Sequence, residues 1–179
     1  MEIVSTRNNL NRRSIRWSGY DYSQPGAYFV TVCGNGMESL LATIASKEVR
    51  LTKLGEIAAE GFRSLPSRFP LIEIPIFCVM PNHVHAIVSN TNIGRGEVTS
   101  PSPIQGGVSP PLPMITLRKI MAFYKYQTTK QINNTLSTSG LRFWQRNYYE
   151  RVIRDDRELE AVYDYIDTNP ANWLGDKYR

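Results

Sequence analysis

The sequence predicts an α+β fold: a ferredoxin-like β-α-β-β-α-β core with an antiparallel sheet, helices on one face of that sheet, and a further C-terminal helix. Short segments rich in aromatic and β-branched residues alternate with longer segments whose apolar residues recur at helical spacing. Two strand-like segments are joined by a Pro-Asn turn, which is typical of an antiparallel hairpin. The 179 residues are 41% hydrophobic, enough to bury the core of one ordinary domain.

The first half of the core begins with a strand at Ala27–Cys33, AYFVTVC. A second, short strand is predicted near Lys47–Leu51. Thr52 then suits the N-cap of a helix that runs to about Leu65, where prolines follow. The apolar face of this helix is formed by Leu54, Ile57, Ala58 and Phe62.

A hairpin and a long loop occupy the middle of the chain. The segments 71–80, LIEIPIFCVM, and 83–89, HVHAIVS, are two apolar strands separated by Pro81 and Asn82. Residues 91–114 contain five Pro and four Gly and show no periodicity. They predict a flexible loop within the domain.

The second half predicts a helix, a strand region and a last helix. The helix spans about Ile115–Asn133, and the strand region spans Phe143–Ile153. Asp155 or Asp156 caps the last helix, which continues through Thr168. The buried stripe predicted for the first of these helices consists of Leu117, Ile120, Met121, Tyr124, Thr128 and Ile132.

The chain therefore divides into a basic N-terminal arm (1–20), one domain (21–173) and a short tail (174–179). Several protein classes are excluded by composition. No apolar run approaches the ~18 residues of a membrane span, and the N-terminus lacks the apolar region of a secretory signal. Cys33 and Cys78 are too few for a disulfide framework or a cysteine zinc site. We expect a cytoplasmic protein.

Positive charge is concentrated in two blocks. The net charge of +5 combines a net of +3 in residues 1–20, a net of +7 in residues 115–154 and a net of −5 in residues 155–169. Together with 11% aromatic residues, this favours a nucleic-acid partner, because cations neutralise phosphates and rings stack on unpaired bases. Two basic blocks beside one acidic helix suggest a site that holds both phosphate and metal.

The only two histidines, His83 and His85, are separated by Val84 in a predicted strand. Residues i and i+2 of a strand point to the same face, so the two imidazoles form half of a site for a divalent metal. The other interpretation is a pair of surface histidines without a ligand. A metal site needs a third ligand.

The last predicted helix offers a candidate for the third metal ligand. Its apolar stripe is predicted to be Leu159, Val162, Tyr163 and Ile166, which makes Tyr163 a core residue. Tyr165 points about 110° away from this stripe, and Asn169 follows one turn later on the same flank. Tyr165 and Asn169 either join the histidines, or are an exposed tyrosine and a helix-capping asparagine.

Several segments of the sequence together resemble those of a known protein family. MPNHVHAIV (80–88) looks like the His-hydrophobic-His motif of single-stranded-DNA endonucleases, and YDYIDTNPANW (163–173) looks like the tyrosine helix of small insertion-sequence transposases. Together with GYDYSQPGAYFVTVC (19–33), YKYQTTKQIN (124–133) and FWQRNYYERVIRD (143–155), they resemble the REP-associated tyrosine transposases. The resemblance runs from about Arg12 to Trp173.

The resemblance implies an enzyme that cleaves and rejoins single-stranded DNA at palindromic hairpins through a 5′-phosphotyrosine intermediate. It implies that Tyr165 is the nucleophile, and that His83, His85 and Asn169 hold a divalent metal, Mg²⁺ or Mn²⁺. Relatives in the family are monomers or homodimers.

Candidate DNA contacts come from the two basic blocks. They are Arg12, Arg13, Arg16, Trp17, Arg118, Lys125 and Arg146, with Tyr20 and Trp144 as further rings that can stack on bases. Two other functions stay open. One is a non-catalytic nucleic-acid-binding module of ferredoxin-like fold, and the other is a metal hydrolase that uses the histidine pair.

Overall fold

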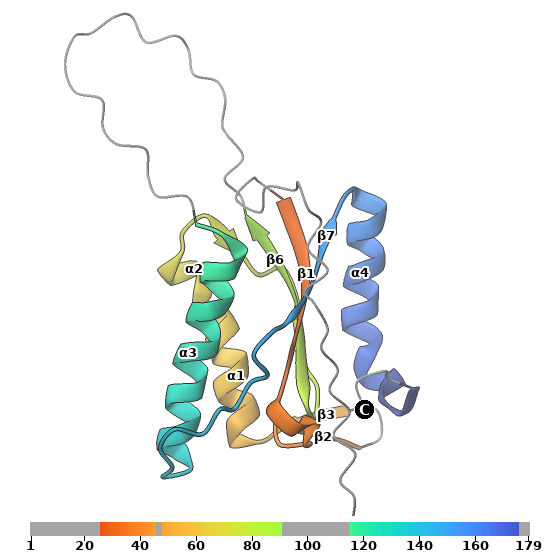
Figure 1. Cartoon of the computed structure of the whole chain (residues 1–179). Coiled ribbons are helices and arrows are strands. Elements are labelled where there is room, and N and C mark those ends of the chain that lie inside the picture. Colours follow the sequence, from red (N-terminus) through yellow and green to blue (C-terminus); the bar gives the residue numbers. More distant parts are fainter. Residues whose placement is uncertain (1–25, 46–47, 91–114, 176–179) are drawn as a thin grey trace, which may run out of the picture.

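The structure, a computed structural model, describes residues 26–45, 48–90 and 115–175 (Figure 1). The predictions made for the basic arm lie outside the described residues. These include the DNA contacts assigned to Arg12, Arg13, Arg16 and Trp17 and the stacking assigned to Tyr20. The prediction of a flexible loop at 91–114 lies outside them as well.

One antiparallel sheet forms the centre of the fold. Its strands are β1 (Gly26–Cys33), β4 (Ile72–Glu73), β5 (Phe77–Val79), β6 (His83–Asn90) and β7 (Tyr149–Ile153). The strand order is β4-β6-β1-β7, and β5 also pairs with β6 on the side of β4. The first strand thus lies between the last two, as in a ferredoxin-like core, and the predicted fold is confirmed.

Three helices cover the two faces of this sheet. Helices α1 (Lys53–Arg63) and α3 (Leu117–Thr135) lie on one face, and α4 (Asp156–Thr168) lies on the other (Figure 1). The core under α1 and α3 is the larger, because alternate valines of β1 and β6 point into it. All six residues of the stripe predicted for the 115–133 helix are buried in α3.

Side-chain caps fix where the helices begin. The hydroxyl of Thr52 accepts a hydrogen bond from the Gly55 amide at 3.2 Å, so α1 starts at the predicted place. Of the two aspartates proposed for the last helix, Asp155 is the cap, and its carboxylate accepts from the Glu158 amide at 2.8 Å. Thr116 caps α3 in the same way.

Some elements differ from the prediction. Pro75 has no amide proton to donate to the ladder, and the strand predicted over 71–80 is divided there into β4 and β5. Only the end of the 143–153 region is a strand. After α1 the chain continues into α2 (Leu65–Arg68), since the first turn of a helix tolerates Pro66. A small separate sheet pairs β2 (Ala42–Ala45) with β3 (Glu48–Leu51), and two 3₁₀ turns, η1 (Asn35–Met37) and η2 (Asn169–Gly175), complete the elements.

Among the helices of the described segments, none is both long and apolar enough to cross a membrane.

Gly61 allows α1 and α3 to pack closely. A Cβ atom at this position would lie 2.5 Å from the Thr128 methyl carbon and 2.8 Å from a ring carbon of Tyr124. Both neighbours are buried, and Tyr124 is held by a hydrogen bond from its hydroxyl to the Ala58 carbonyl at 3.2 Å. The helices therefore cannot keep their separation around a larger residue.

We predict that Gly61→Ala lowers the free energy of unfolding by about 1–3 kcal/mol, the usual cost of overpacking. Helix propensity alone favours Ala over Gly by about 1 kcal/mol, so a loss of stability has to come from the steric conflict. Urea unfolding measures the change. Gly175→Ala, where an added Cβ meets open space, is the control and should leave the midpoint unchanged. A Gly61→Ala protein as stable as the wild type would contradict this account of the packing.

Candidate active site

Strand alternation places both histidines on the sheet face that α4 covers. Val84 and Ala86 point to the opposite face, into the core under α1 and α3. His83 and His85 are fully buried, at 0% exposure each. The interpretation of a surface histidine pair is therefore wrong, because β6 is an inner strand of the sheet and both of its faces are covered.

The two imidazoles face each other through their Nε2 atoms. These atoms are 2.9 Å apart, and the ring centroids are 4.4 Å apart. Two nitrogen ligands at right angles on one metal, each at about 2.1 Å, stand about 3 Å from each other. The observed spacing thus suits adjacent positions of an octahedral ion.

The other ring nitrogens have fixed partners. His83 Nδ1 lies 2.7 Å from Asn82 Oδ1. The Asn82 amide nitrogen donates to the Met37 carbonyl at 3.2 Å, which turns the amide oxygen towards the imidazole. An oxygen that only accepts requires the ring proton on Nδ1, so the lone pair of His83 lies on Nε2.

Thr31 provides the partner of the second histidine. Its register position on β1 is directly opposite His85, and its hydroxyl oxygen is 2.8 Å from His85 Nδ1. A hydroxyl both donates and accepts, so Thr31 accommodates either tautomer of His85. With the proton on Nδ1, both Nε2 lone pairs face one point and can ligate a cation. With the proton on Nε2, His85 donates to His83 instead.

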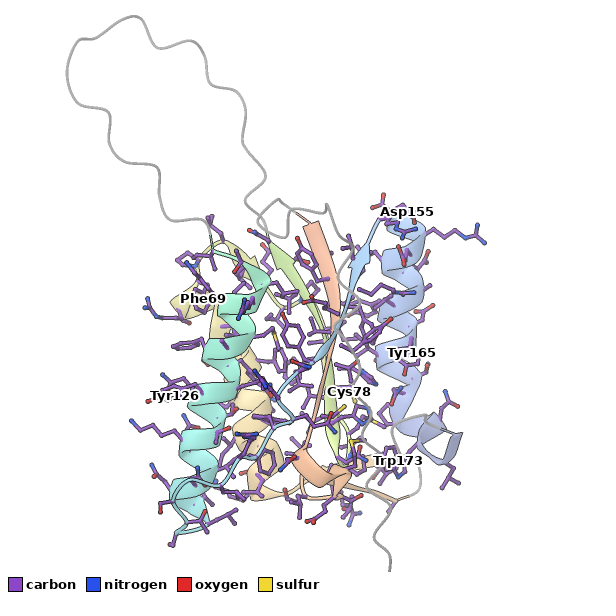
Figure 2. All side chains as sticks on the ribbon, in the orientation of Figure 1. Phe69, Cys78, Tyr126, Asp155, Tyr165 and Trp173 are labelled. Carbon is purple, nitrogen blue, oxygen red and sulfur yellow. The ribbon has the colours of Figure 1, made fainter. Side chains whose placement is uncertain are left out.

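Tyr165 reaches this pair from α4. Its hydroxyl oxygen lies 3.5 Å from His85 Nε2, and the two ring centroids are 5.3 Å apart. Phe29 positions both rings, since it stacks on His85 at 5.3 Å and meets Tyr165 edge-on at 5.8 Å. Tyr165 is 39% exposed, so its ring stands at the rim of the site and is accessible from solvent (Figure 2).

The buried stripe of α4 is shifted from the predicted one. Tyr163 was assigned to the core and is 44% exposed, so that prediction is wrong. The side of α4 that faces the sheet is centred on Val162 and Ile166. This side continues to Asn169, and Tyr163 lies outside it. The shift places Tyr165 at the edge of the interface with the sheet.

Asn169 is buried where α4 ends. Its exposure is 4%, and its Oδ1 atom has no hydrogen-bond partner within the described ranges. The exposed Asn172, not Asn169, bonds to the end of the helix, through a 3.2 Å contact with the Thr168 carbonyl. A buried amide oxygen without a partner is costly, and a cation would satisfy it. Trp173, in the η2 turn that Asn169 opens, lies 6.1 Å from His83 between ring centroids (Figure 2).

Cysteines flank the histidines but are poor ligands. Cys33 is opposite His83 in the sheet, and Cys78 is opposite His85. Burial, with a smaller effect of the Asp167 charge, raises the pKa of Cys78 to about 12. The thiolate, which is the form that binds metals, is therefore disfavoured. In the part of the chain that the structure describes, no three His, Cys, Asp or Glu side chains gather to hold a metal.

The side chains that could hold a metal are thus the two imidazoles, whose Nε2 atoms face each other, and the buried amide oxygen of Asn169, which has no partner in the described ranges. Imidazole and amide-oxygen donors can bind a divalent cation.

The remaining DNA-contact candidates lie in the α3 layer. Arg118 is exposed near the start of α3, and Arg146 is exposed beyond its end. The Lys125 ammonium donates hydrogen bonds to the carbonyls of Gln145 and Arg146, so it holds the backbone of this protein. Trp144 is 2% exposed and donates from its indole nitrogen to Thr128 at 2.8 Å, which makes it a core residue.

Sequence reasoning did not identify the residues that orient the site. Thr31, Asn82 and Phe29 contact the histidines, and although all three lie within the segments that carry the family resemblance, none of them was predicted as a site residue. Phe29 and Thr31 alternate with Cys33 along the first strand, so the three side chains share one face of it. This spacing identifies Phe29 and Thr31 as neighbours of the histidines only when the pairing of this strand with the histidine strand is known.

Comparison with known proteins gives the relatives of the chain. No family model matches it. An uncharacterized protein of Haemophilus influenzae is 32% identical over 168 residues, which cover 93% of this chain and 92% of that protein. The chain belongs to the same family as this protein.

Two further matches carry a functional name. A Haemophilus influenzae protein named "Putative REP-associated tyrosine transposase" is 22% identical over 161 residues, covering 84% of this chain and 73% of the relative. A solved structure, "Structure of the REP associates tyrosine transposase bound to a REP hairpin", has a TM-score of 0.53 at 19% identity, covering 86% of this chain and 72% of that one. The chain resembles the REP-associated tyrosine transposases, as its motifs predict, and it shares their fold.

Proposed function

We propose that this protein is a metal-dependent single-stranded-DNA transposase that cleaves and rejoins strands at palindromic hairpins through a 5′-phosphotyrosine intermediate. The observation that carries the proposal is the meeting of Tyr165 with the histidine pair, because the tyrosine hydroxyl lies 3.5 Å from His85 Nε2. The REP-associated tyrosine transposase that was solved bound to a REP hairpin supports a DNA hairpin as the partner.

The proposed reaction is a transesterification. The Tyr165 hydroxyl oxygen attacks a backbone phosphorus and forms a P–O bond, which joins the protein to the 5′ end created at the break. The bond from phosphorus to the 3′ oxygen is cleaved, and that oxygen leaves as a free 3′-hydroxyl after taking up a proton. Because one phosphodiester replaces another, rejoining needs no external energy source.

The phenol has to lose its proton to attack. The usual pKa of a tyrosine is about 10, so little phenolate exists at neutral pH. The exposed position of Tyr165 lets the proton leave to solvent. His83, His85 and Asn169 would hold the divalent metal, which when bound supplies positive charge for the scissile phosphate.

The first prediction concerns the covalent intermediate. The protein is incubated with Mn²⁺ or Mg²⁺ and a pool of hairpin oligonucleotides that carry randomised single-stranded flanks. We expect a protein–DNA adduct that survives denaturing electrophoresis, that is lost in Tyr165→Phe, and that is strongly reduced in His83→Ala. Tyr163→Phe is the matched control, because Tyr163 is an exposed tyrosine two residues away on the same helix, and this variant should form the adduct normally.

Other outcomes would contradict specific parts of the proposal. An adduct that persists in Tyr165→Phe means that another residue is the nucleophile. Cleavage without any adduct identifies a metal hydrolase. Binding of the hairpins without cleavage or adduct in every condition identifies a non-catalytic binding module.

The second prediction concerns the third metal ligand. If the unpartnered Oδ1 of Asn169 binds the metal, Asn169→Leu should weaken Mn²⁺ binding by about tenfold or more, whereas Asn169→Asp should retain it, since a carboxylate oxygen is also a ligand for this ion. Electron paramagnetic resonance of free Mn²⁺ measures the affinity without DNA. Asn172→Leu, in the same turn, is the control, and equal affinities in Asn169→Leu and wild type would exclude Asn169 as a ligand.

The third prediction concerns the orientation of His85. Thr31→Val keeps the shape of the side chain but removes the oxygen that bonds to His85 Nδ1. We expect Mn²⁺ affinity to fall by about 10–100-fold, the usual loss when the partner of a ligating histidine is removed, with rescue in Thr31→Ser. Nitrogen NMR of the imidazoles should show a changed tautomer balance for His85 in the valine variant. An unchanged spectrum and affinity would mean that Thr31 does not orient this ring.

A further inference from the structure

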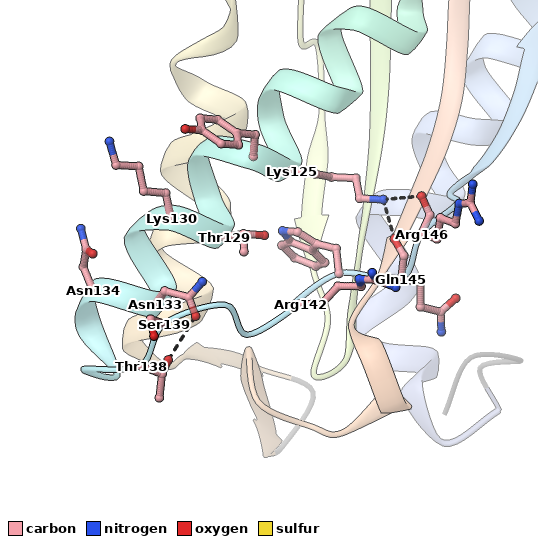
Figure 3. A pocket seen from close by; sticks show the side chains of 12 residues that line it. Lys125, Thr129, Lys130, Asn133, Asn134, Thr138, Ser139, Arg142, Gln145 and Arg146 are labelled. Carbon is pink, nitrogen blue, oxygen red and sulfur yellow. Dashed lines mark hydrogen bonds between the residues drawn. The ribbon is translucent and has the colours of Figure 1, made fainter.

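A groove of about 540 Å³ lies on the outer side of the α3 layer (Figure 3). Its walls are the C-terminal half of α3 and the segment 138–146, which turns back along that helix. The walls present cations, amides, hydroxyls and one exposed tyrosine. The lining residues are Lys125, Tyr126, Thr129, Lys130, Asn133, Asn134, Thr138, Ser139, Arg142, Trp144, Gln145 and Arg146.

The groove is positively charged and contains no acid. Four of its lining residues are Lys or Arg, and none is Asp or Glu. Lys130, Arg142 and Arg146 are exposed, and none of them forms an ion pair with another residue of the described ranges. Three cations without internal partners, grouped around one hollow, favour an anion with several charges.

Hydrogen bonds between the segment 138–146 and α3 hold the groove in shape. The Lys125 ammonium bonds to the carbonyls of Gln145 and Arg146, as Figure 3 shows, and this fixes the segment against α3. Burial lowers the pKa of Lys125, an effect that Cys33 partly offsets. Trp144 closes the floor through its hydrogen bond to Thr128. Lys130, Arg142 and Arg146 thus extend from a surface whose backbone is held in place by these hydrogen bonds.

The same segment connects the groove to the histidine end of the sheet. The Gln145 amide donates to the Cys33 carbonyl at 3.0 Å, and Trp144 forms a bridge with Gly34. Cys33 is in turn paired with His83. One continuous backbone segment therefore links the groove to the end of β1 that carries the partner of His83.

We propose that this groove binds the sugar–phosphate backbone of the DNA whose cleavage is proposed above, and the inference rests on that function. Lys130, Arg142 and Arg146 neutralise consecutive phosphates. Tyr126, which is 65% exposed and one turn before Lys130, stacks on an unpaired base. Lys125 supports the groove instead of contacting phosphate.

The test measures DNA binding with the chemistry switched off. In a Tyr165→Phe background, Lys130→Gln, Arg142→Gln and Arg146→Gln are combined, and fluorescence anisotropy follows the binding of the flanked hairpin pool over a range of salt concentrations. Removal of three phosphate contacts should reduce the slope of log affinity against log salt by about 2–3. Affinity at low salt should fall at least tenfold.

A matched control removes the same charge elsewhere in the same layer. The control combines Arg63→Gln, Arg68→Gln and Lys119→Gln, three exposed positions outside the groove. It should keep nearly the wild-type slope. Equal losses in the two triple variants would show that net charge, and not the groove, attracts the DNA, and would overturn the inference.

Tyr126 gives an independent readout. Tyr126→Ala should weaken binding of a single-stranded oligo-dT, and Tyr126→Phe should not, because stacking needs the ring and not the hydroxyl. Unchanged binding in Tyr126→Ala would remove the stacking part of the inference.

The groove and the proposed function fail in different ways. A groove variant that binds and responds to salt like the control overturns the groove, whatever adduct the otherwise wild-type protein forms. Lack of an adduct in the wild type, with groove-dependent binding intact, overturns the cleavage chemistry and leaves a nucleic-acid-binding groove.

Discussion

The pairing of β1 with β6 is the constraint on which the rest of the structure depends. All eight residues of β1 are in register with β6, from Gly26 opposite Asn90 to Cys33 opposite His83. Because side chains alternate across a sheet, this single register assigns valines to the α1 and α3 face, and assigns both histidines and Thr31 to the α4 face. A slip of one residue would bury the wrong set on each face and take Thr31 away from His85.

Burying two imidazoles and an amide oxygen requires hydrogen-bond partners. Asn82 and Thr31 bond to the Nδ1 atoms, and the two Nε2 atoms lie 2.9 Å apart, within hydrogen-bond distance of each other, whereas Asn169 Oδ1 lacks a hydrogen-bond partner in the described segments. Apolar side chains at these positions would pack α4 on the sheet without the desolvation cost of buried polar groups. The unpartnered oxygen of Asn169 is the feature of this cluster that the proposed cation would satisfy.

The sequence sufficed to predict the ferredoxin-like core, both core helices and the meeting of Tyr165 with the histidines, because those follow from periodicity, caps and motifs. The sequence placed Tyr163 in the core wrongly. Helical spacing defines which residues form an apolar stripe, but it does not show which part of that stripe contacts the sheet. Thr31 and Asn82 were missed because their roles exist only once strand register and the 81–82 turn are known. Lys125 was predicted to contact DNA, yet its ammonium holds the carbonyls of Gln145 and Arg146, a contact between distant positions that the sequence alone does not show.

Charge is distributed unevenly between α4 and the groove beside α3. On α4 the first-turn acids Asp156 and Glu158 complement the positive end of the helix, and Glu158 is paired with Arg151 at 3.5 Å. The remaining acids of α4 repel a phosphate backbone, whereas the groove beside α3 attracts it. If the proposed metal is held by His83, His85 and Asn169, its charge would offset this repulsion beside Tyr165, at the end of the acidic helix.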